Sequence, residues 1–267
     1  MSLFHLLLIA AIQGLTEFLP VSSSGHLVLL PQVTGAEDQG LAIDVAVHIG
    51  TLGAVILYFW ADVKLALAGT GRLLRGKVDT GGAFLALCLA IATVPVVIAG
   101  ALLHLTGLAE ALRSVAVIGW AMLGFGIVLY LADQRGPKER TAAQWSLKDA
   151  ALMGLAQAIA LIPGTSRAGI CITAGRALGY DREGAARLAM LMSIPTIIAS
   201  GTLLGLDVAG QANWALMRDG LIAAVFAFAC ALLALWIMMR LLRTVSFTPY
   251  VIYRCLLGIG LLIWAYS

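Results

Sequence analysis

Long apolar stretches alternate with short polar segments along most of this chain of 267 residues. Six of these stretches are uninterrupted: about 42–60, 83–104, 114–132, 185–206, 219–240 and 249–266. A helix needs about 20 apolar residues to cross the hydrocarbon core of a bilayer, and each stretch comes close to that length. The pattern therefore predicts six transmembrane helices.

Two further apolar segments, about 3–33 and 149–175, are each interrupted by a short polar run. The runs read FLPVSSSGH and LIPGTSRAG, and both contain proline, glycine and hydroxyl side chains. Each half of such a segment has only about 10–15 residues, which is too short to span a bilayer. Irregular backbone at membrane depth is tolerated where it is buried in protein or lines a wet cavity. We therefore expect two re-entrant helical hairpins.

The order hairpin, three spans, hairpin, three spans suggests an internal repeat. Aligning Pro20 with Pro163 places Ser22 on Thr165 and Ser23 on Ser166. Because three is odd, the second copy would enter the membrane upside down. The prediction is an all-α, polytopic membrane protein of one domain, 1–267, with an inverted-topology repeat: repeat one about 1–133, repeat two about 149–267. The alternative is two unrelated breaks that share proline and serine.

The composition agrees with a membrane protein. Hydrophobic residues make up 61% of the chain, charged residues 12%, and the mean hydropathy is +0.98. With half the usual share of charge, such a chain cannot cover a globule with solvated surface, which excludes a soluble enzyme, a disordered protein and a nucleic-acid-binding domain. The formal net charge of +3 is too small for a polyanion-binding protein. The surroundings we expect are membrane lipids and no nucleic acid.

The basic residues divide unevenly between the two sides of the predicted bundle. One side holds Lys64, Arg72, Arg75, Lys77, Arg135, Lys138, Arg140, Lys148, Arg176, Arg182, Arg187, Arg240 and Arg243. The other side holds Arg113 and Arg218. The positive-inside rule makes the first side cytoplasmic, so both termini and the first hairpin are expected to face outward.

Ionisable side chains inside apolar segments point to function by default. Glu17 precedes Pro20, and Gln13 lies one helical turn earlier on the same face. The two can hold a hard cation such as Mg²⁺ or Ca²⁺. Alternatively, Glu17 acts as a general base, or the two form a polar pair that bonds a neighbouring helix.

The first break supplies hydroxyls and an imidazole. Ser22, Ser23 and Ser24 precede Gly25 and His26. Serine is a preferred helix N-cap, which accounts for at least one of the three. A helix that starts at membrane depth also directs N–H groups at an anion, and hydroxyl, imidazole and carboxylate together are the parts of an activated nucleophile.

The second break supplies a cation. Arg167 follows the turn at Gly164 and the hydroxyls of Thr165 and Ser166. Its guanidinium fits a phosphate bidentately, or pairs with Glu17 as a structural ion pair. The two breaks together suit phosphoryl transfer, in which positioning and charge neutralisation provide most of the catalysis.

Other ionisable or small-residue positions receive a structural interpretation. Asp44 and His48 lie one turn apart and are expected to form a pair or the edge of a pocket. Arg254 lies near the cytoplasmic start of the last span and is expected to snorkel toward the interface. The small residues at 119–126 allow close helix packing and leave room for a homodimer.

At these motifs the chain resembles the undecaprenyl-diphosphate phosphatase family, the bacterial bacitracin-resistance proteins. The family pattern (E/Q)xxxE followed by PVSSxGH stands here as QGLTEFLPVSSSGH, and PGxSRSxxT stands as PGTSRAGICIT. The resemblance extends over the whole chain, including REGAARLAMLMSIP. Ala168 stands where the family usually has serine, and Gln13 is the permitted variant at the first acidic position.

The resemblance implies hydrolysis of undecaprenyl diphosphate to undecaprenyl phosphate and inorganic phosphate with a divalent cation, in the bacterial cytoplasmic membrane. The expected topology, with the first hairpin entering from the outer side, opens the site to the outer face. It carries catalytic roles to Glu17, Ser23, His26 and Arg167. It further implies that substrate is bound by Ser22, Ser24, Gly164, Thr165, Ser166 and Thr173, and metal by Gln13 and Glu17.

The sequence leaves two questions open. The nucleophile is Ser23, His26 or water. The alternative function is a transporter or flippase of a polyprenyl phosphate, because inverted repeats with broken helices around a midplane anion site are also typical of transporters.

Overall fold

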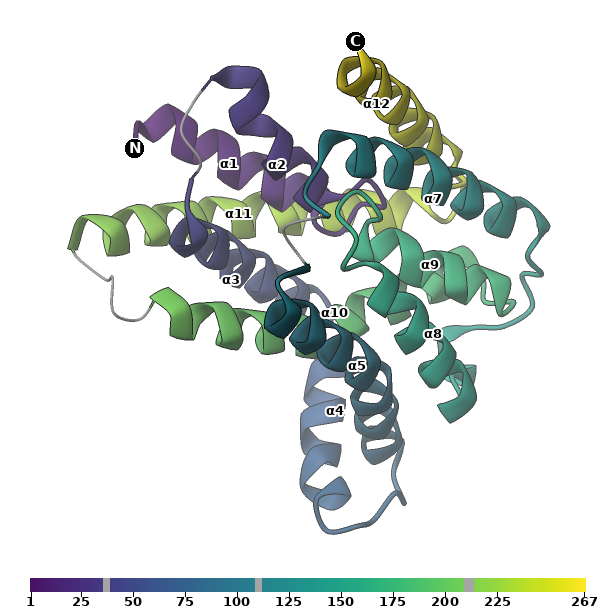
Figure 1. Cartoon of the computed structure of the whole chain (residues 1–267). Coiled ribbons are helices and arrows are strands. Elements are labelled where there is room, and N and C mark those ends of the chain that lie inside the picture. The colour runs from purple at the N-terminus through teal and green to yellow at the C-terminus, as the bar shows by residue number, and fades with distance from the viewer. Residues whose placement is uncertain (36–38, 109–111, 209–213) are drawn as a thin grey trace.

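The computed structural model describes residues 1–35, 39–108, 112–208 and 214–267. Over these ranges the chain is helical and contains no strand; the one β-bridge joins Arg140 and Tyr180. The helices of the first half are α1 (Leu3–Thr16), α2 (Ser23–Thr34), α3 (Leu41–Tyr58), α4 (Trp60–Leu73), α5 (Gly81–Thr106) and α7 (Val115–Arg135). Those of the second half are the 3-10 turn η1 (Ala142–Gln144), α8 (Leu147–Ile159), α9 (Arg167–Ala177), α10 (Arg182–Val208), α11 (Trp214–Leu241) and α12 (Thr248–Tyr266). Figure 1 shows their arrangement.

In the described ranges, six helices are long and apolar enough to cross a membrane. They are α3, α5, α7, α10, α11 and α12. Each coincides with one of the six predicted apolar stretches, so the number and order of the spans are confirmed in length and composition. The outward faces carry large exposed hydrophobic side chains, including Trp214, Leu221 and Leu256, as expected for a protein surrounded by lipid.

The segment between the first two spans contains an additional helix. The chain bends at Phe59 and continues as α4, which packs against the first turns of α5 (Figure 1). The two helices approach closely at Gly69, which has no side chain. A Cβ there would lie 2.0 Å from the carbonyl carbon of Gly82, so any larger residue would clash. With 14 residues, three of them charged, α4 is shorter than the roughly 20 apolar residues that a span needs.

The two interrupted segments each form a pair of short helices. The pair α1 and α2 has 14 and 12 residues, and the pair α8 and α9 has 13 and 11. All four are shorter than the roughly 20 residues that a span needs. Each pair belongs to a different half of the chain, and the two breaks approach each other near the centre of the molecule (Figure 1).

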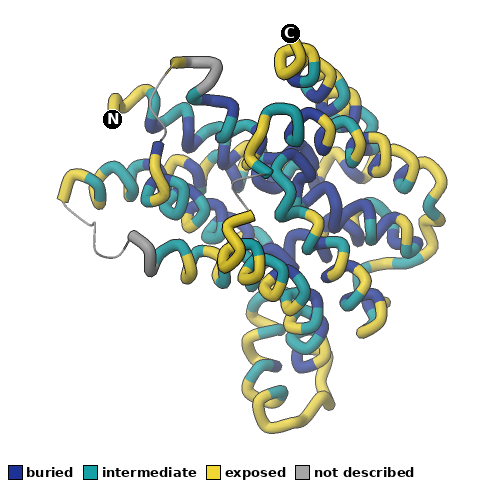
Figure 2. Tube along the Cα trace, in the orientation of Figure 1, coloured by how far each residue is buried: buried dark blue, intermediate teal, exposed yellow. Residues whose placement is uncertain are grey.

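The buried core surrounds these two breaks. Helix α1 packs on α11, α8 packs on α5, and α7 packs on α12. Buried positions concentrate at the centre of the bundle, whereas α4 and the outward helix faces are exposed (Figure 2). The core includes Phe18 beside the first break and Ala168 beside the second, so buried side chains flank both breaks, while Ser24 of the first break is exposed.

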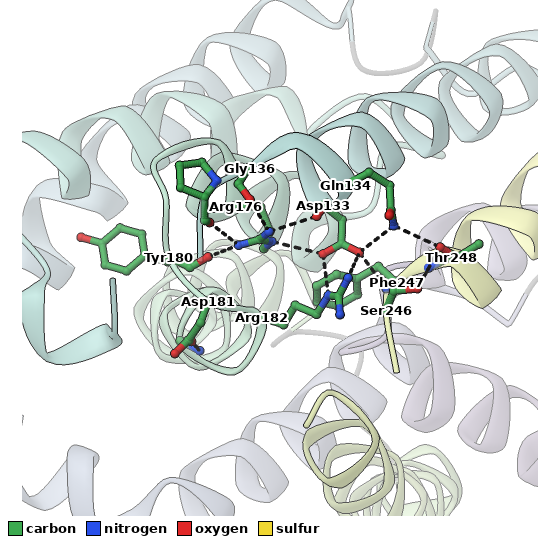
Figure 3. Close-up of polar contacts among 12 residues, drawn as sticks. Asp133, Gln134, Gly136, Arg176, Tyr180, Asp181, Arg182, Ser246, Phe247 and Thr248 are labelled. Carbon is green, nitrogen blue, oxygen red and sulfur yellow. Dashed lines mark hydrogen bonds and ion pairs between the residues drawn. The ribbon is translucent and has the colours of Figure 1, made fainter. Parts of the chain in front are cut away.

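A buried ion network joins four helices at one end of the bundle (Figure 3). Asp133 at the end of α7 is fully buried, and its Oδ1 accepts from Nε of Arg176 at 3.1 Å and from Nε of Arg182 at 2.7 Å. Its Oδ2 accepts from the backbone N–H of Phe247 at 3.2 Å. Arg176 is itself fully buried and also donates to the carbonyl oxygens of residues 136, 137 and 180. The network therefore fixes the ends of α7 and α9 against the starts of α10 and α12.

The small-residue face at 119–126 is used inside the chain. A Cβ at Gly119 would lie 3.0 Å from the side chain of Leu262, and a Cβ at Gly258 would lie 2.9 Å from the carbonyl oxygen of Gly119. These contacts allow α7 to pack closely on α12. A homodimer stays a prediction, and Gly119 does not supply its interface.

Candidate active site

Each break ends in a serine that caps the following helix. Ser22 precedes α2 with a φ of 75°, and Ser166 precedes α9 with a φ of 68°. The side-chain oxygen of Ser22 accepts from the N–H of Gly25, and that of Ser166 accepts from the N–H of Gly169. A positive φ is unfavourable for a residue with a Cβ, and such strain persists only where the surrounding structure enforces it. The two breaks thus share an unusual local structure.

The caps define a register that differs from the one expected from the prolines. Ser22 and Ser166 occupy the same place in the two breaks, whereas aligning Pro20 with Pro163 pairs Ser22 with Thr165. In the register of the caps, Ser23 corresponds to Arg167, because each is the first residue of its helix. The nucleophile candidate and the arginine therefore lie at the positive ends of two helix dipoles.

The carboxylate of Glu17 connects the two breaks. Its Oε2 accepts from the hydroxyl of Ser23 at 2.7 Å and from Nε2 of Gln13 at 2.9 Å. Its Oε1 accepts from Nη2 of Arg167 at 2.8 Å. Glu17 is buried, and the side chain of Arg167 is 13% exposed. The ion pair with Glu17, one of the two alternatives for Arg167, is therefore present, and it also includes the serine hydroxyl.

His48 lies close to the same carboxylate. Its Nε2 is 3.9 Å from Oε2 of Glu17, and its Nδ1 is 2.7 Å from the carbonyl oxygen of Asp44. The carboxylate of Asp44 accepts from Nε2 of Gln39 at 2.8 Å. No spacing in the chain places His48 beside Glu17, although a histidine inside an apolar span is a signal of function.

His26 contacts α12. Its Nδ1 donates to the carbonyl oxygen of Ser22 at 2.6 Å, and its Nε2 lies 2.5 Å from the hydroxyl of Tyr253. The two rings are stacked with their centroids 5.7 Å apart. Because a carbonyl only accepts, the neutral imidazole carries its proton on Nδ1, and Nε2 accepts from Tyr253. Tyr253 was not among the predicted site residues.

The predicted phosphate-binding residues differ in accessibility. Ser24 is exposed, and its hydroxyl lies 3.4 Å from that of Ser22. Thr165 is fully buried, and its hydroxyl has no hydrogen-bond partner among the residues that the structure describes, whereas the buried Thr173 donates to the carbonyl oxygen of Gly169 at 2.7 Å.

The second cap and the glycine of its turn have structural contacts. Ser166 is buried and donates to the carbonyl oxygen of Leu19 at 3.5 Å, which adds a second link between the breaks. Gly164 has a φ of 91°, and a Cβ there would lie 2.6 Å from the carbonyl oxygen of Ile118. Substrate binding by these residues stays a prediction.

Arg254 does not snorkel. It is fully buried and donates to the backbone carbonyl oxygens of four residues: Pro20, Ala121, Met122 and Gly164. The expectation that Arg254 snorkels was wrong. Backbone carbonyl oxygens of the two breaks and of α7 satisfy its guanidinium inside the protein, so the side chain does not need to reach the membrane interface.

The donor atoms around Glu17 fit a hard cation. Within the described ranges there is no group of three or more His, Cys, Asp or Glu side chains that could hold a metal by themselves. However, Oε1 of Gln13 is buried and finds no hydrogen-bond partner in the described part of the chain, so it is an available oxygen beside the carboxylate of Glu17. Mg²⁺ commonly takes one or two protein oxygens and completes its shell with substrate phosphate and water.

Comparison with known proteins gives a consistent picture. Residues 6–260 match the family model described as bacitracin resistance protein BacA. The chain is 72% identical over 267 residues to the undecaprenyl-diphosphatase of Roseobacter denitrificans and 71% identical to that of Dinoroseobacter shibae, covering 100% of each pair. It is 47% identical over 273 residues to undecaprenyl-diphosphatase 1 of Rhodospirillum rubrum, covering 100% of this chain and 96% of the relative.

Proposed function

The chain belongs to the bacitracin resistance protein family, and we propose that the two breaks form the active site in which it hydrolyses undecaprenyl diphosphate. It is a phosphatase that produces undecaprenyl phosphate and inorganic phosphate, recycles the lipid carrier of cell-wall synthesis and gives bacitracin resistance. The observation that supports this site is the position of Glu17, which contacts the hydroxyl of Ser23 and the guanidinium of Arg167 at the same time.

Ser23 is the nucleophile in the mechanism that the geometry favours. Glu17 takes the hydroxyl proton across the 2.7 Å hydrogen bond while Oγ attacks the terminal phosphorus. The bond from that phosphorus to the bridging oxygen breaks, and undecaprenyl phosphate leaves. Water then attacks the phosphoserine and releases inorganic phosphate, and the proton returns to Ser23.

The charge on the transferred phosphoryl group is neutralised by groups from both breaks. Arg167 supplies a planar pair of donors that fits phosphate oxygens. The first N–H groups of α2 and α9 supply the positive ends of two helices. A divalent cation held by Gln13 and Glu17 would neutralise the negative charge of the diphosphate. In such a reaction, electrostatic stabilisation is usually the largest contribution to catalysis.

His26 is less well placed as the nucleophile or the base. Both of its nitrogens are engaged, by the carbonyl oxygen of Ser22 and by the hydroxyl of Tyr253. Attack by Nε2 would first require the Tyr253 hydrogen bond to break. Direct attack by water, with Glu17 as the base, is the third route.

Turnover and phosphoenzyme trapping distinguish the three routes. We expect Ser23→Ala and Glu17→Gln to lower phosphate release from undecaprenyl diphosphate in detergent by at least about 10²-fold, because general-base catalysis alone contributes that much. The matched control is Glu139→Gln, since Glu139 is exposed and far along the chain from both breaks. Trapped phosphate should be on Ser23, and Ser23→Cys should retain a nucleophile.

Near-normal turnover of Ser23→Ala would overturn the serine route, and phosphate trapped on His26 would establish the histidine route. The detergent assay also separates hydrolysis from transport, because transport requires two compartments. A chelator should lower turnover if the cation contributes as proposed.

We also propose that the two helix pairs are re-entrant hairpins of an inverted repeat, over about 1–133 and 149–267. Three observations support the repeat. Ser22 and Ser166 are equivalent caps, the carbonyl oxygens of the equivalent Pro20 and Gly164 both accept from Arg254, and α1 packs on α11 as α8 packs on α5. An odd number of spans between the pairs would invert the second copy.

The proposed orientation places the active site on the outer side of the bacterial cytoplasmic membrane, with both termini outside. It is supported by the basic residues, which are concentrated on the opposite side of the bundle. The polyprenyl tail of the substrate would lie among the membrane lipids in the outer leaflet, with its diphosphate between the breaks.

A further inference from the structure

Arg254 is a buried cation bonded only to neutral groups. In the described part of the chain, all four of its hydrogen bonds go to backbone carbonyl oxygens, and no carboxylate pairs with it. Nε donates to Met122 at 3.2 Å, Nη1 to Pro20 at 3.2 Å, and Nη2 to Ala121 at 3.3 Å and Gly164 at 3.1 Å. An arginine inside a membrane protein is costly unless its N–H groups are satisfied, so this set of acceptors needs a reason.

The surrounding helices leave space for this guanidinium. A Cβ at Gly126 of α7 would lie 3.3 Å from Cβ of Arg254. A Cβ at Gly169 of α9 would lie 2.9 Å from Nη1 of Arg254, closer than ordinary van der Waals contact. Two helices from different halves of the chain therefore each have a glycine at the point where Arg254 passes.

The acceptors on the two breaks are equivalent. Pro20 lies three residues before Ser23, and Gly164 lies three residues before Arg167. One rigid guanidinium thus holds the same point of both breaks and fixes their separation. That separation determines whether Glu17 can reach both Ser23 and Arg167.

We propose that Arg254 is a positioning residue that aligns Ser23 with Arg167 by binding the carbonyl oxygens of both breaks. This inference rests on the proposed active site. Arg254 itself is fully buried and acts through the backbone of the breaks. Lysine cannot replace it, because one ammonium nitrogen has three N–H donors and no planar fork that reaches four separate carbonyls.

The test separates kcat from KM in purified Arg254→Met and Arg254→Lys, measured per folded protein in detergent. We expect kcat to fall by about 10²-fold in both variants with KM nearly unchanged, since misplacing reacting groups by about 1 Å costs that much. The matched control is Arg243→Met, because the side chain of Arg243 is 69% exposed and lies 3.6 Å from Glu183. It should retain the wild-type kcat.

A double-mutant cycle with Ser23→Ala tests the stated route. If Arg254 acts by aligning Ser23, adding Arg254→Met to Ser23→Ala should lower the residual kcat much less than it lowers that of the wild type. Strict additivity would overturn the proposal, and so would a wild-type kcat in folded Arg254→Met. If Ser23→Ala itself stayed active, the proposed active site would fail instead.

If Arg254→Met does not fold, Gly169→Ala gives an independent answer. It keeps the charge and displaces Nη1 through the 2.9 Å contact, and the same Cβ would lie 3.2 Å from Cβ and Oγ of the capping Ser166, so kcat should fall while KM is preserved. A wild-type kcat in Gly169→Ala would overturn the proposal.

Discussion

At the scale of single residues, Glu17 has an unusually crowded carboxylate. Arg167 binds one oxygen, and Gln13 and Ser23 bind the other. In the proposed mechanism, the substrate phosphate competes with Glu17 for the N–H groups of Arg167. When the diphosphate binds, Arg167 therefore lets go of one oxygen of Glu17. This happens in the enzyme–substrate complex, where Glu17 must accept a proton.

Tyr180 gives a residue-scale prediction outside the membrane spans. It is fully buried, donates to Oδ2 of Asp149 at 2.7 Å and accepts from Arg140 at 2.9 Å. Burial and the hydrogen bond to Asp149 raise the pKa of Tyr180 above its usual value near 10. At neutral pH, Tyr180→Phe should lower the free energy of unfolding by about 1 kcal/mol through the lost hydrogen bonds.

The pH dependence of that difference has a definite sign. The raised pKa means that the contribution of Tyr180 is complete below about pH 10 and is lost as the pH rises further, because the unfolded tyrosine then ionises first. The gap in thermal midpoint between wild type and Tyr180→Phe should be constant from about pH 7 to pH 9 and narrow above about pH 10. Tyr130→Phe, at a more exposed site, is the control. A gap that widens at high pH would contradict the assignment.

Some site residues could be predicted from the sequence, and others could not. Glu17, Ser23 and Arg167 stand out because charged and hydroxyl groups are rare in apolar segments, and the structure brings them together. His48 and Tyr253 depend on how α3 and α12 pack against the first break, which sequence spacing does not determine. Arg254 was misassigned because the sequence shows that it lies near the start of a span, but it does not show which backbone carbonyl groups of other segments surround it.

At the scale of helices, the network around Asp133 stabilises four elements at once. Asp133→Asn would leave Arg176 and Arg182 without their carboxylate, and breaking a buried ion pair in this way costs about 3–5 kcal/mol. We therefore expect a marked fall in the thermal midpoint of unfolding in detergent. The control is Asp79→Asn, because Asp79 and Arg72 form an exposed pair, which should contribute much less than a buried one. Equal effects of the two variants would contradict this role of the network.

The helices themselves were predictable to different degrees. The six spans follow directly from apolar length, and the proline, glycine and serine runs located both breaks. The extra helix α4 was missed because its charged residues resemble a loop. The register between the breaks was off by one residue, because the capping serines, and not the prolines, occupy equivalent backbone positions.

At the scale of the whole molecule, the orientation in the membrane is testable by labelling. Ser267→Cys and Lys77→Cys each place a thiol at an exposed position, in a background in which Cys230 and Cys255 are replaced and the buried Cys88 and Cys171 are kept. An impermeant maleimide should label Ser267→Cys in intact cells and Lys77→Cys only after permeabilisation. The reverse pattern would place the active site on the cytoplasmic side.

The position of Arg254 in the last helix has a consequence for biosynthesis. The ribosome completes both breaks well before residue 254, so a nascent chain already contains Glu17, Ser23 and Arg167 while α12 is still absent. On the proposed role of Arg254, these groups are not aligned until the final span has inserted. Truncated chains and stalled translation products would therefore sit in the membrane without hydrolysing the lipid carrier.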